Sequence, residues 1–435
     1  MLSTNNINKS TYIWNMIGSM LNAFQSVIFL MILTRVSSLS DSGVFTIAFA
    51  DANLFLLIGK YGVRYFHASD TSYQYDFKVY RHTRVITTLL MLVISFAYTM
   101  ITAKIIGYSL YKTSVILWMC VFKLPDSYED AYFGEYQRRG RLDVAAKTWS
   151  VRLILTTFVF GVSLVLSGNL LNSLIITSVV TACLMMLLLF RTKVLTYEEC
   201  KENESSTLMA ESKENVNAIS GNEVHLWIFS LLKECAPLFV STFLAFYILN
   251  APKYSIDALM TDEIQACFGF VAMPVFVVSV LTSMIYNPVI HKMSVWWDEK
   301  QSTNFNKEVW KQFFYVVIVT LICLLGAFLI GIPVLSLLYN TDLTDYKFDL
   351  IVMLIGGGFL GVCNWFNAVL TIMRKQNYML MGYGLVSILA FLGMNRVAVL
   401  YHVNGVSVLF TLLVFVLMIV FVLIYLISLR RRKHE

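Results

Sequence analysis

Charged residues are scarce in this sequence: 14% of its 435 residues are Asp, Glu, Lys or Arg, whereas 58% are hydrophobic. Soluble domains carry about 25% charged residues, so most of this chain must face hydrocarbon. Only helices and closed barrels can span a bilayer, and the long apolar runs here lack the period-2 alternation of barrel strands. The sequence therefore predicts an all-α polytopic membrane protein.

Motifs of nucleotide-driven or metal chemistry are also lacking. No GxxxxGK[ST] loop occurs, the seven cysteines show no disulfide or zinc spacing, and the six histidines show no metal spacing. The loops expected outside are too short for the catalytic loop of a membrane glycosyltransferase or ligase. We therefore expect no enzyme, no catalytic residue, no metal and no bound cofactor. The first apolar run is too long for a cleavable signal peptide, so we expect it to stay as a membrane helix.

A spanning helix needs about 20 mainly apolar residues. Twelve stretches meet this requirement, at approximately 11–34, 43–63, 84–103, 107–131, 144–167, 170–190, 226–250, 264–287, 309–338, 348–373, 376–397 and 405–429. The one long polar stretch is acidic and rich in Ser and Asn, and it separates six spans from six. We expect an N-terminal six-helix lobe at 1–195, a cytoplasmic linker at 196–224 and a C-terminal six-helix lobe at 225–435.

The distribution of Lys and Arg predicts the orientation. If the N-terminus is cytoplasmic, 24 of the 33 Lys and Arg residues fall in cytoplasmic segments, six fall outside and three lie within spans. Positive charge accumulates on the cytoplasmic side of membrane proteins. Both termini are therefore expected in the cytoplasm. Because topology accounts for most of these cations, the net charge of +6 gives no reason to expect a nucleic-acid partner.

Seven cations fall in or at the ends of predicted spans. They are Arg35, Lys60, Arg64, Lys123, Arg152, Lys233 and Lys253. A charge at bilayer depth costs roughly 2.5–3.5 kcal/mol on insertion scales, so such residues usually face a protein interior or a water-filled cavity. A cavity whose buried charges are mainly positive suggests an anionic cargo. For Lys60 and Arg64 the alternative is that both extend to lipid headgroups as interfacial anchors.

The fourth and fifth predicted spans are dense in charge. Lys123, Asp126 and Asp130 share a helical face, so partial neutralisation within the helix is the simplest interpretation, and Pro125 is expected to kink the helix there. Arg152 lies about two turns into the fifth span and has no acidic partner nearby in the sequence. This isolation favours a cavity role for Arg152.

Asp51 lies near the middle of the second predicted span, where an isolated carboxylate needs a partner. It can be a counter-ion to a cation on a neighbouring helix, or it can bind a proton or Na⁺ that drives transport. In the seventh span, Lys233 and Lys253 lie near opposite ends of a helix that Pro237 is expected to bend. Such a helix is consistent with a gate and with ordinary bending.

Glycines gather in the tenth predicted span, at Gly356, Gly357, Gly358 and Gly361. Small residues let the backbones of membrane helices approach closely. We therefore expect tight helix packing around this span.

Several segments together resemble a known family. LTRVSSLSDSGVF, IGKYGVR, GEYQRRGRLDVAAK, ILNAPKYSIDALMTDEIQACFGFVAMPVFV and TIMRKQ resemble the Wzx-like polysaccharide-export flippases of the multidrug/oligosaccharidyl-lipid/polysaccharide (MOP) exporter superfamily. The resemblance implies two six-helix lobes around a V-shaped central cavity. It also implies movement of a polyprenyl-diphosphate-linked oligosaccharide, a repeat unit of a cell-surface polysaccharide, from the inner to the outer leaflet by alternating access. Arg35, Lys60, Arg64, Arg152 and Lys253 fall in or beside these motifs.

The same resemblance implies a bacterial cytoplasmic membrane, contacts with membrane lipids, and a polysaccharide polymerase and glycosyltransferases as partners. H⁺ or Na⁺ is a possible coupling ion. Two alternatives remain: a cation-coupled multidrug exporter of the same superfamily, which predicts an acid-lined cavity, and a membrane glycosyltransferase or ligase. Lys123, Lys233 and Asp51 enter the candidate site on the argument from charge and depth alone.

Overall fold

The computed structural model describes residues 4–70, 74–203 and 221–434, and within these ranges it contains helices and no strand. The longer helices are α1 (Thr4–Val36), α2 (Leu39–Lys60), α4 (Phe77–Ile106), α5 (Leu110–Phe122), α6 (Leu124–Arg138), α7 (Leu142–Ser167), α8 (Leu170–Asn203), α10 (Gly221–Leu259), α11 (Asp262–Tyr286), α13 (Ser302–Gly326), α15 (Lys347–Ile372) and α16 (Gln376–His434). Shorter elements are α3 (Val63–Ser69), α12 (Ile290–Asp298), α14 (Ile332–Tyr339), the 3-10 turns η1 (Asn287–Val289) and η3 (Thr344–Tyr346), and the π-helical turn η2 (Ala327–Gly331). The all-α prediction is confirmed.

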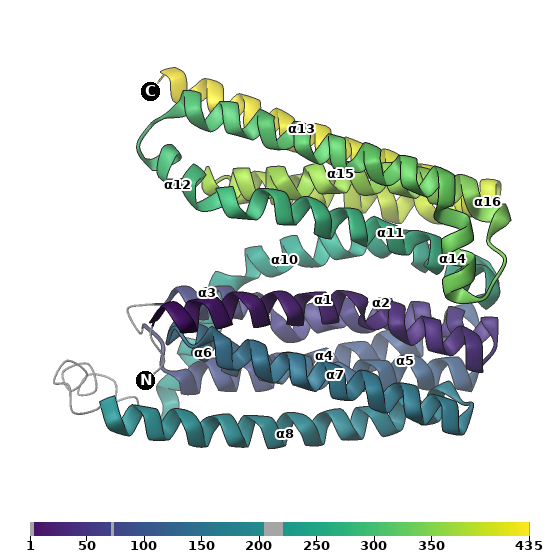
Figure 1. The fold of residues 1–435 in the computed structure, drawn as a ribbon, viewed down its shortest axis with the longest axis horizontal. Helices are drawn as coiled ribbons and strands as arrows, with labels where there is room; N and C mark the ends of the chain where they lie inside the picture. Colours follow the sequence, from purple (N-terminus) through teal and green to yellow (C-terminus); the bar gives the residue numbers. More distant parts are fainter. Residues whose placement is uncertain (1–3, 71–73, 204–220, 435) are drawn as a thin grey trace. The chain divides into compact units, whose positions relative to one another are not determined.

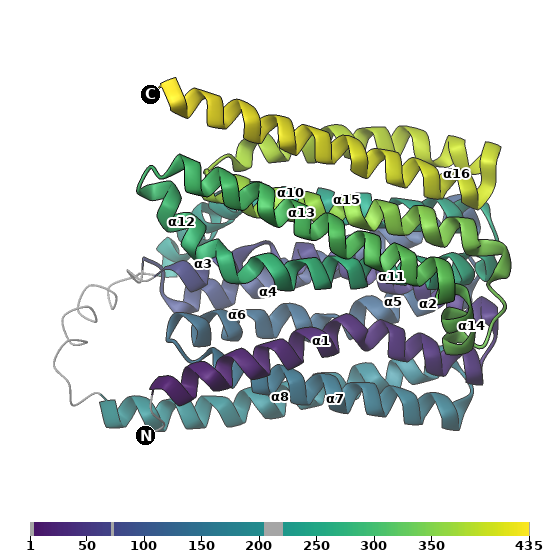
Figure 2. The same cartoon turned by 45° about the horizontal axis from the view of Figure 1, so that its top comes forward.

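Each of the twelve predicted spans corresponds to helical structure. In the described part of the chain, ten helices are long and apolar enough to cross a membrane, and the last of them, Gln376–Arg430, holds the eleventh and twelfth predicted spans. The chain reverses direction at His402, whose φ of 51° lies outside the helical region, as Figure 2 shows for α16. The fourth predicted span is divided at Lys123 into α5 and α6. Pro125 lies in the first turn of α6, where a missing N–H costs little.

Most of these helices expose apolar side chains. In the most apolar window of Ser302–Tyr339, 6% of the residues are buried inside the protein, against 83% for Leu39–Lys60. Soluble proteins rarely expose such continuous apolar surface, and lipid can cover it. The chain is a multi-pass membrane protein.

The described residues form two compact units. Unit 1 comprises Met1–Ser37 and Ala48–Phe239, and unit 2 comprises Ser38–Ile47 and Val240–Glu435. The helices α2 and α10 therefore each contribute to both units. Residues 204–220, in the expected linker, lie outside the described residues, and the expected lobes 1–195 and 225–435 stay a prediction.

In unit 1, α7 packs between α1 and α8, while α6 contacts α3, α4 and α7 (Figure 1). The rings of Phe29 on α1 and Phe160 on α7 stack with centroids 3.9 Å apart. The start of α1, the short helix α3 and the α6–α7 turn lie at one end of unit 1, on the left in Figure 1. The same end carries the cations of 60–84 and 138–147, which the orientation prediction places in the cytoplasm.

In unit 2, α15 contacts α11, α13 and α16. Glycines of α15 explain the close approach, because an added Cβ at Gly358 would lie 2.2 Å from Thr320 of α13. At Gly356 it would lie 2.9 Å from Phe410 of α16. Small residues allow such contact between helices in membranes. The buried core of unit 2 includes Trp365 of the same helix.

Candidate functional site

A row of carboxylates on α6 organises the charged interior of unit 1. Asp126, Glu129, Asp130 and Glu135 are all buried, and each of them contacts at least one cation. Asp126, Glu129 and Asp130 lie within four residues of one another and share one side of α6, whereas Glu135 lies further along the helix on another side. The first three acids of this row, together with five cations, form a cluster that we call the α6 network; the cations are Lys60, Arg64, Arg84, Lys123 and Arg152.

Arg152 of α7 is held between two of these acids. Its Nη2 atom donates to Asp126 and to Glu129, and its side chain is 2% exposed. The sequence shows no acidic partner near Arg152, and the structure supplies two from another helix. The partners lie 26 and 23 residues earlier in the chain, on a helix that packs beside α7.

Lys123 lies at the junction of α5 and α6. Its Nζ atom lies 3.2 Å from Asp126, which confirms the expected neutralisation within the helix, and it also faces the rings of Phe49 and Phe122. Lys60, in the last turn of α2, is half-buried, and its charge acts on Asp126. Asp126 is thus surrounded by three cations.

Asp130 was expected to help neutralise Lys123, but its partners in the structure are two arginines. Arg84 of α4 is fully buried and donates to Asp130 at 2.7 Å, while Arg64 of α3 lies 3.5 Å from the same carboxylate. The other terminal nitrogen of Arg84 donates to the carbonyl of Gly59 at 2.8 Å, and Thr87 donates to that carbonyl at 2.7 Å. Arg84 thus satisfies a carbonyl at the end of α2 and a buried acid together.

Sequence reasoning treated Arg84 only as an orientation charge. Its position in the sequence could have indicated more. Arg84 is the first residue of a predicted span and follows Lys78 and Arg81, so water reaches it less easily than it reaches those two cations. Glu129 and Glu135 were also missed as members of the site. The signal for both was their place on the same short helix as the acids that had been noticed.

A second cluster lies nearer the end of α6, outside the predicted spans. Glu135 accepts hydrogen bonds from His67 at 2.9 Å and from Arg139 at 2.6 Å, and Arg138 also donates to it. Burial alone would raise the pKa of Glu135, but the His67 hydrogen bond and the two arginine charges outweigh it and lower the pKa to about 2. Glu135 is therefore ionised at neutral pH.

Asp70 closes this cluster at the end of α3. It accepts from the backbone N–H groups of Gln74 and Tyr75 and from the hydroxyl of Tyr80, and it lies 3.6 Å from Arg138. Burial favours the neutral acid, but these hydrogen bonds and the Arg138 charge lower the pKa of Asp70 overall.

The remaining candidate residues lie on other helices and differ in burial. Arg35 is exposed and donates to the carbonyl of Met31 in its own helix, and Lys233 is exposed on α10. Lys253 is buried, but in unit 2, with its Nζ atom 5.8 Å from the ring centre of Phe276. Asp51 is buried in α2 within unit 1. The structure therefore gathers Lys60, Arg64, Lys123 and Arg152 into the α6 network.

Over the described residues as a whole, buried carboxylic acids outnumber buried Lys and Arg, although the α6 network itself holds more cations than acids. Among the buried residues that the structure describes, nine are carboxylic acids: Asp51, Asp70, Asp126, Glu129, Asp130, Glu135, Asp143, Asp257 and Asp349. Five are Lys or Arg: Arg84, Lys112, Lys123, Arg152 and Lys253. The interior is acid-rich, because α6 supplies carboxylates that the argument from isolated cations did not count.

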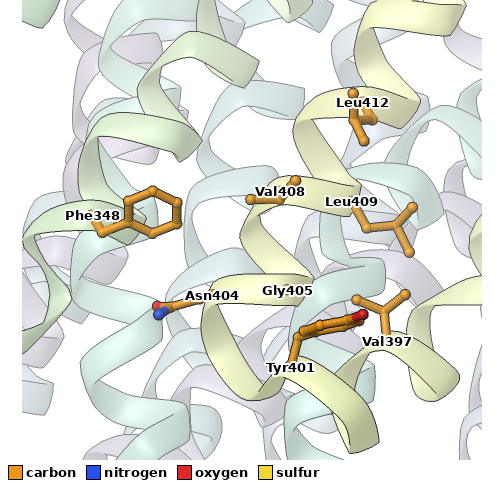
Figure 3. Close-up of a pocket in the computed structure, with 8 residues that line it drawn as sticks. All are labelled: Phe348, Val397, Tyr401, Asn404, Gly405, Val408, Leu409 and Leu412. Carbon is orange, nitrogen blue, oxygen red and sulfur yellow. The ribbon is translucent and has the colours of Figure 1, made fainter.

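Unit 2 has a groove between α15 and the turn of α16 (Figure 3). It has a volume of about 560 Å³ and is lined by Phe348, Val397, Tyr401, Asn404, Gly405, Val408, Leu409 and Leu412. Asn404 is its one amide, and none of the candidate cations lines it. In the ranges that the structure describes, no group of three or more His, Cys, Asp or Glu side chains is placed to hold a metal ion.

Comparison with known proteins shows what this chain is similar to. No protein-family model matches the sequence, and no curated protein matches it. Among solved structures, a mutant of the Vibrio cholerae MATE transporter VcmN is 14% identical and has a TM-score of 0.64, and the match covers 99% of both chains.

Two further structures extend this likeness. An inward-facing multidrug resistance MATE family transporter of the MOP superfamily is 12% identical over 96% of both chains, with a TM-score of 0.66. A MOP superfamily transporter from Pyrococcus furiosus, described as having a binding pocket of reverse polarity, is 12% identical with a TM-score of 0.56, over 98% of this chain and 95% of that one. At these identities the comparisons show the fold alone. The chain has the fold of the MATE transporters, and its Wzx-like subtype stays a prediction.

Proposed function

We propose that this protein is a transporter that exports its cargo across the membrane by alternating access, without catalysing a reaction. The observation that carries the proposal is the end-to-end match with MATE transporters. An inward-facing and an outward-facing structure of multidrug resistance MATE family transporters are both among the matches, with TM-scores of 0.66 and 0.55. The buried charges of the α6 network support a transport role, because ionisable groups within membrane helices usually serve a substrate or ion path.

For the cargo, we place a cation-coupled multidrug exporter first. Its support is the excess of buried carboxylates over buried Lys and Arg, since an acid-rich interior attracts organic cations and repels anions. Two of the similar structures are described as multidrug resistance MATE family transporters, which agrees with this cargo class. Asp51 remains our candidate for the residue that binds the coupling H⁺ or Na⁺.

A flippase for polyprenyl-diphosphate-linked oligosaccharides is the second candidate, and a specific observation favours it. Lys253 is buried, and in the described part of the chain no carboxylate forms an ion pair with it. A buried cation that has no carboxylate partner can form a charge-assisted hydrogen bond with a diphosphate. The α6 network points the same way, because it holds five cations and three acids. In this case the site residues would contact the diphosphate, and the membrane would be the bacterial cytoplasmic membrane.

One reconstitution distinguishes the two cargoes. The purified protein is placed in liposomes with an imposed H⁺ or Na⁺ gradient, and uptake of a fluorescent organic cation is measured beside flipping of a fluorescent polyprenyl-diphosphate saccharide. The exporter predicts gradient-dependent uptake of the cation, and the flippase predicts movement of the lipid. Movement of neither cargo under either gradient contradicts the proposal.

Lys253→Gln sharpens the comparison. If Lys253 contacts a diphosphate, this variant loses lipid flipping, whereas an exporter of cations keeps its uptake. Lys311→Gln is the matched control in unit 2, because the Lys311 side chain is 49% exposed and pairs with Glu308 at 3.5 Å. Both variants are compared at equal protein levels in the liposomes.

A further inference from the structure

The short helix α3 is fastened to α6 and α4 by a fully buried histidine. His67 has no exposed surface, and its ring stacks on Tyr80 of α4 with centroids 3.8 Å apart and planes 11° apart. Its Nε2 atom lies 2.9 Å from Glu135 of α6. His67 therefore joins three helices at the end of unit 1 that the orientation prediction places in the cytoplasm.

The hydrogen bonds fix the tautomer of His67. Because Glu135 is ionised and can only accept, Nε2 must carry the hydrogen and donate it. The other nitrogen, Nδ1, is buried and has no hydrogen-bond partner among the described residues. It faces Gly134, where an added Cβ would lie 2.5 Å away, so neither a water nor a side chain fits between them.

A second proton on His67 is poorly accommodated in this arrangement. It would place an N–H donor at Nδ1, where no acceptor is available, and burying an unpaired donor destabilises the closed state. It would also add a positive charge near Arg138 of α6 and Arg84 of α4. Glu135 is the one opposing carboxylate in direct contact, and it already accepts from two arginines.

The charged and titratable groups around His67 come from three helices. At the end of α3 the group is Asp70, which already accepts from Tyr80 and from two backbone N–H groups and lies close to Arg138. The groups on α4 are Tyr80 and Arg84. Those on α6 are Glu135 and Arg138. Burial, together with the two arginines, lowers the pKa of His67 despite the opposing effect of Glu135.

We propose that His67 is a proton-operated latch, so that uptake of one proton from the cytoplasmic side releases α3 from α6 and α4. The break between α2 and α3 lets α3 move by itself, because Tyr61 and Gly62 have φ of 44° and 68° and end the helix that precedes it. Release of α3 also withdraws Arg64, which this helix carries, from Asp130 of the α6 network. The latch thus connects cytoplasmic pH to a cation of that network.

The test measures opening of α3 in the full-length protein in nanodiscs. Val63 is 1% exposed on α3, so Val63→Cys, with the seven native cysteines replaced, reports opening by reaction with a water-soluble methanethiosulfonate. Each rate of thiol modification is divided by the rate for the same variant after denaturation, measured at the same pH. This correction is needed because the reactive thiolate becomes rarer as the pH falls. We expect the normalised rate to rise severalfold from pH 7.5 to pH 5.5, because the pKa of His67 is lower in the closed state than after release, and to stay constant in His67→Gln.

Met373→Cys is the control reporter, because Met373 is 4% exposed at the end of α15 in unit 2. The same rise in His67→Gln, or an equal rise at Met373→Cys, assigns the opening to another group or to general unfolding and overturns the latch. If His67→Gln does not fold, hydrogen exchange of the unsubstituted protein decides the matter. No rise in exchange of residues 63–69 between these pH values, after correction for the intrinsic rate, also overturns it.

Discussion

Arg152 on α7 donates a hydrogen bond to Asp126 on α6, and both side chains lie almost entirely within the protein. The cation that stands alone in the sequence of the fifth span is therefore neutralised by the neighbouring helix. Removing one partner of a buried ion pair leaves an uncompensated charge, which is more costly than the pair itself.

Arg152→Gln is expected to destabilise unit 1 by about 3–5 kcal/mol, because Asp126 and Glu129 then face each other without the guanidinium. The measurement is the thermal denaturation midpoint of the purified protein in detergent. Adding Glu129→Gln to this variant should restore part of the loss, because it removes an unpaired buried charge while Asp126 keeps Lys123 as its partner. A double variant as unstable as Arg152→Gln itself would show that packing of the arginine, rather than its charge, is what matters.

Gly134→Ala is expected to loosen α3, because the new methyl group would lie 2.5 Å from Nδ1 of His67. Alanine is the better helix former by about 1 kcal/mol, so a loss of protection must come from the collision. Hydrogen exchange of residues 63–69 measures the effect. Gly384→Ala is the control, since nothing lies within 4 Å of its Cβ position; unchanged exchange of α3 in Gly134→Ala would contradict the close contact.

Asp349→Ala is expected to weaken the attachment of the α16 turn to α15. Ser407 donates to Asp349 at 2.7 Å, and the Asn404 amide, in the orientation that satisfies both groups, donates at 2.9 Å. Each buried donor that loses its acceptor costs about 1–3 kcal/mol. Faster hydrogen exchange of 400–411 measures the loss, and Asp345→Ala, at an exposed position in the turn before α15, should leave that exchange unchanged.

Acid is expected to detach α3 from α6 in two steps. The folded-state pKa of His67 lies below the unfolded value of about 6.5, so its contribution to stability is complete above that pH and declines as the pH falls. Glu135 has a pKa lowered to about 2, so its contribution is present above about 4.3, the unfolded value, and is lost between there and pH 2. In Glu135→Gln the lower step should disappear from a pH titration of α3 exchange. A lower step that persists would mean that another acid, such as Asp70, produces it.

The sequence by itself determined that this chain is a helical membrane protein with twelve stretches of spanning length. The reason is that hydrocarbon leaves the backbone no other partner than its own helix, so composition and run length suffice. The glycines of the tenth span likewise predicted close packing, since Gly358 and Gly356 have no side chain to separate helices. Neutralisation of Lys123 by Asp126 followed from helical spacing alone.

Contacts between helices were decided only by the tertiary structure. Arg152 meets Asp126 across 26 residues, Arg84 meets Asp130 across 46, and His67 meets Glu135 across 68. A helical repeat says which residues share a face, but it does not say which other helix that face packs against. For this reason the cations could be read from the sequence, whereas the acids that neutralise them, and with them the sign of the buried charge, became visible only in the packed helices.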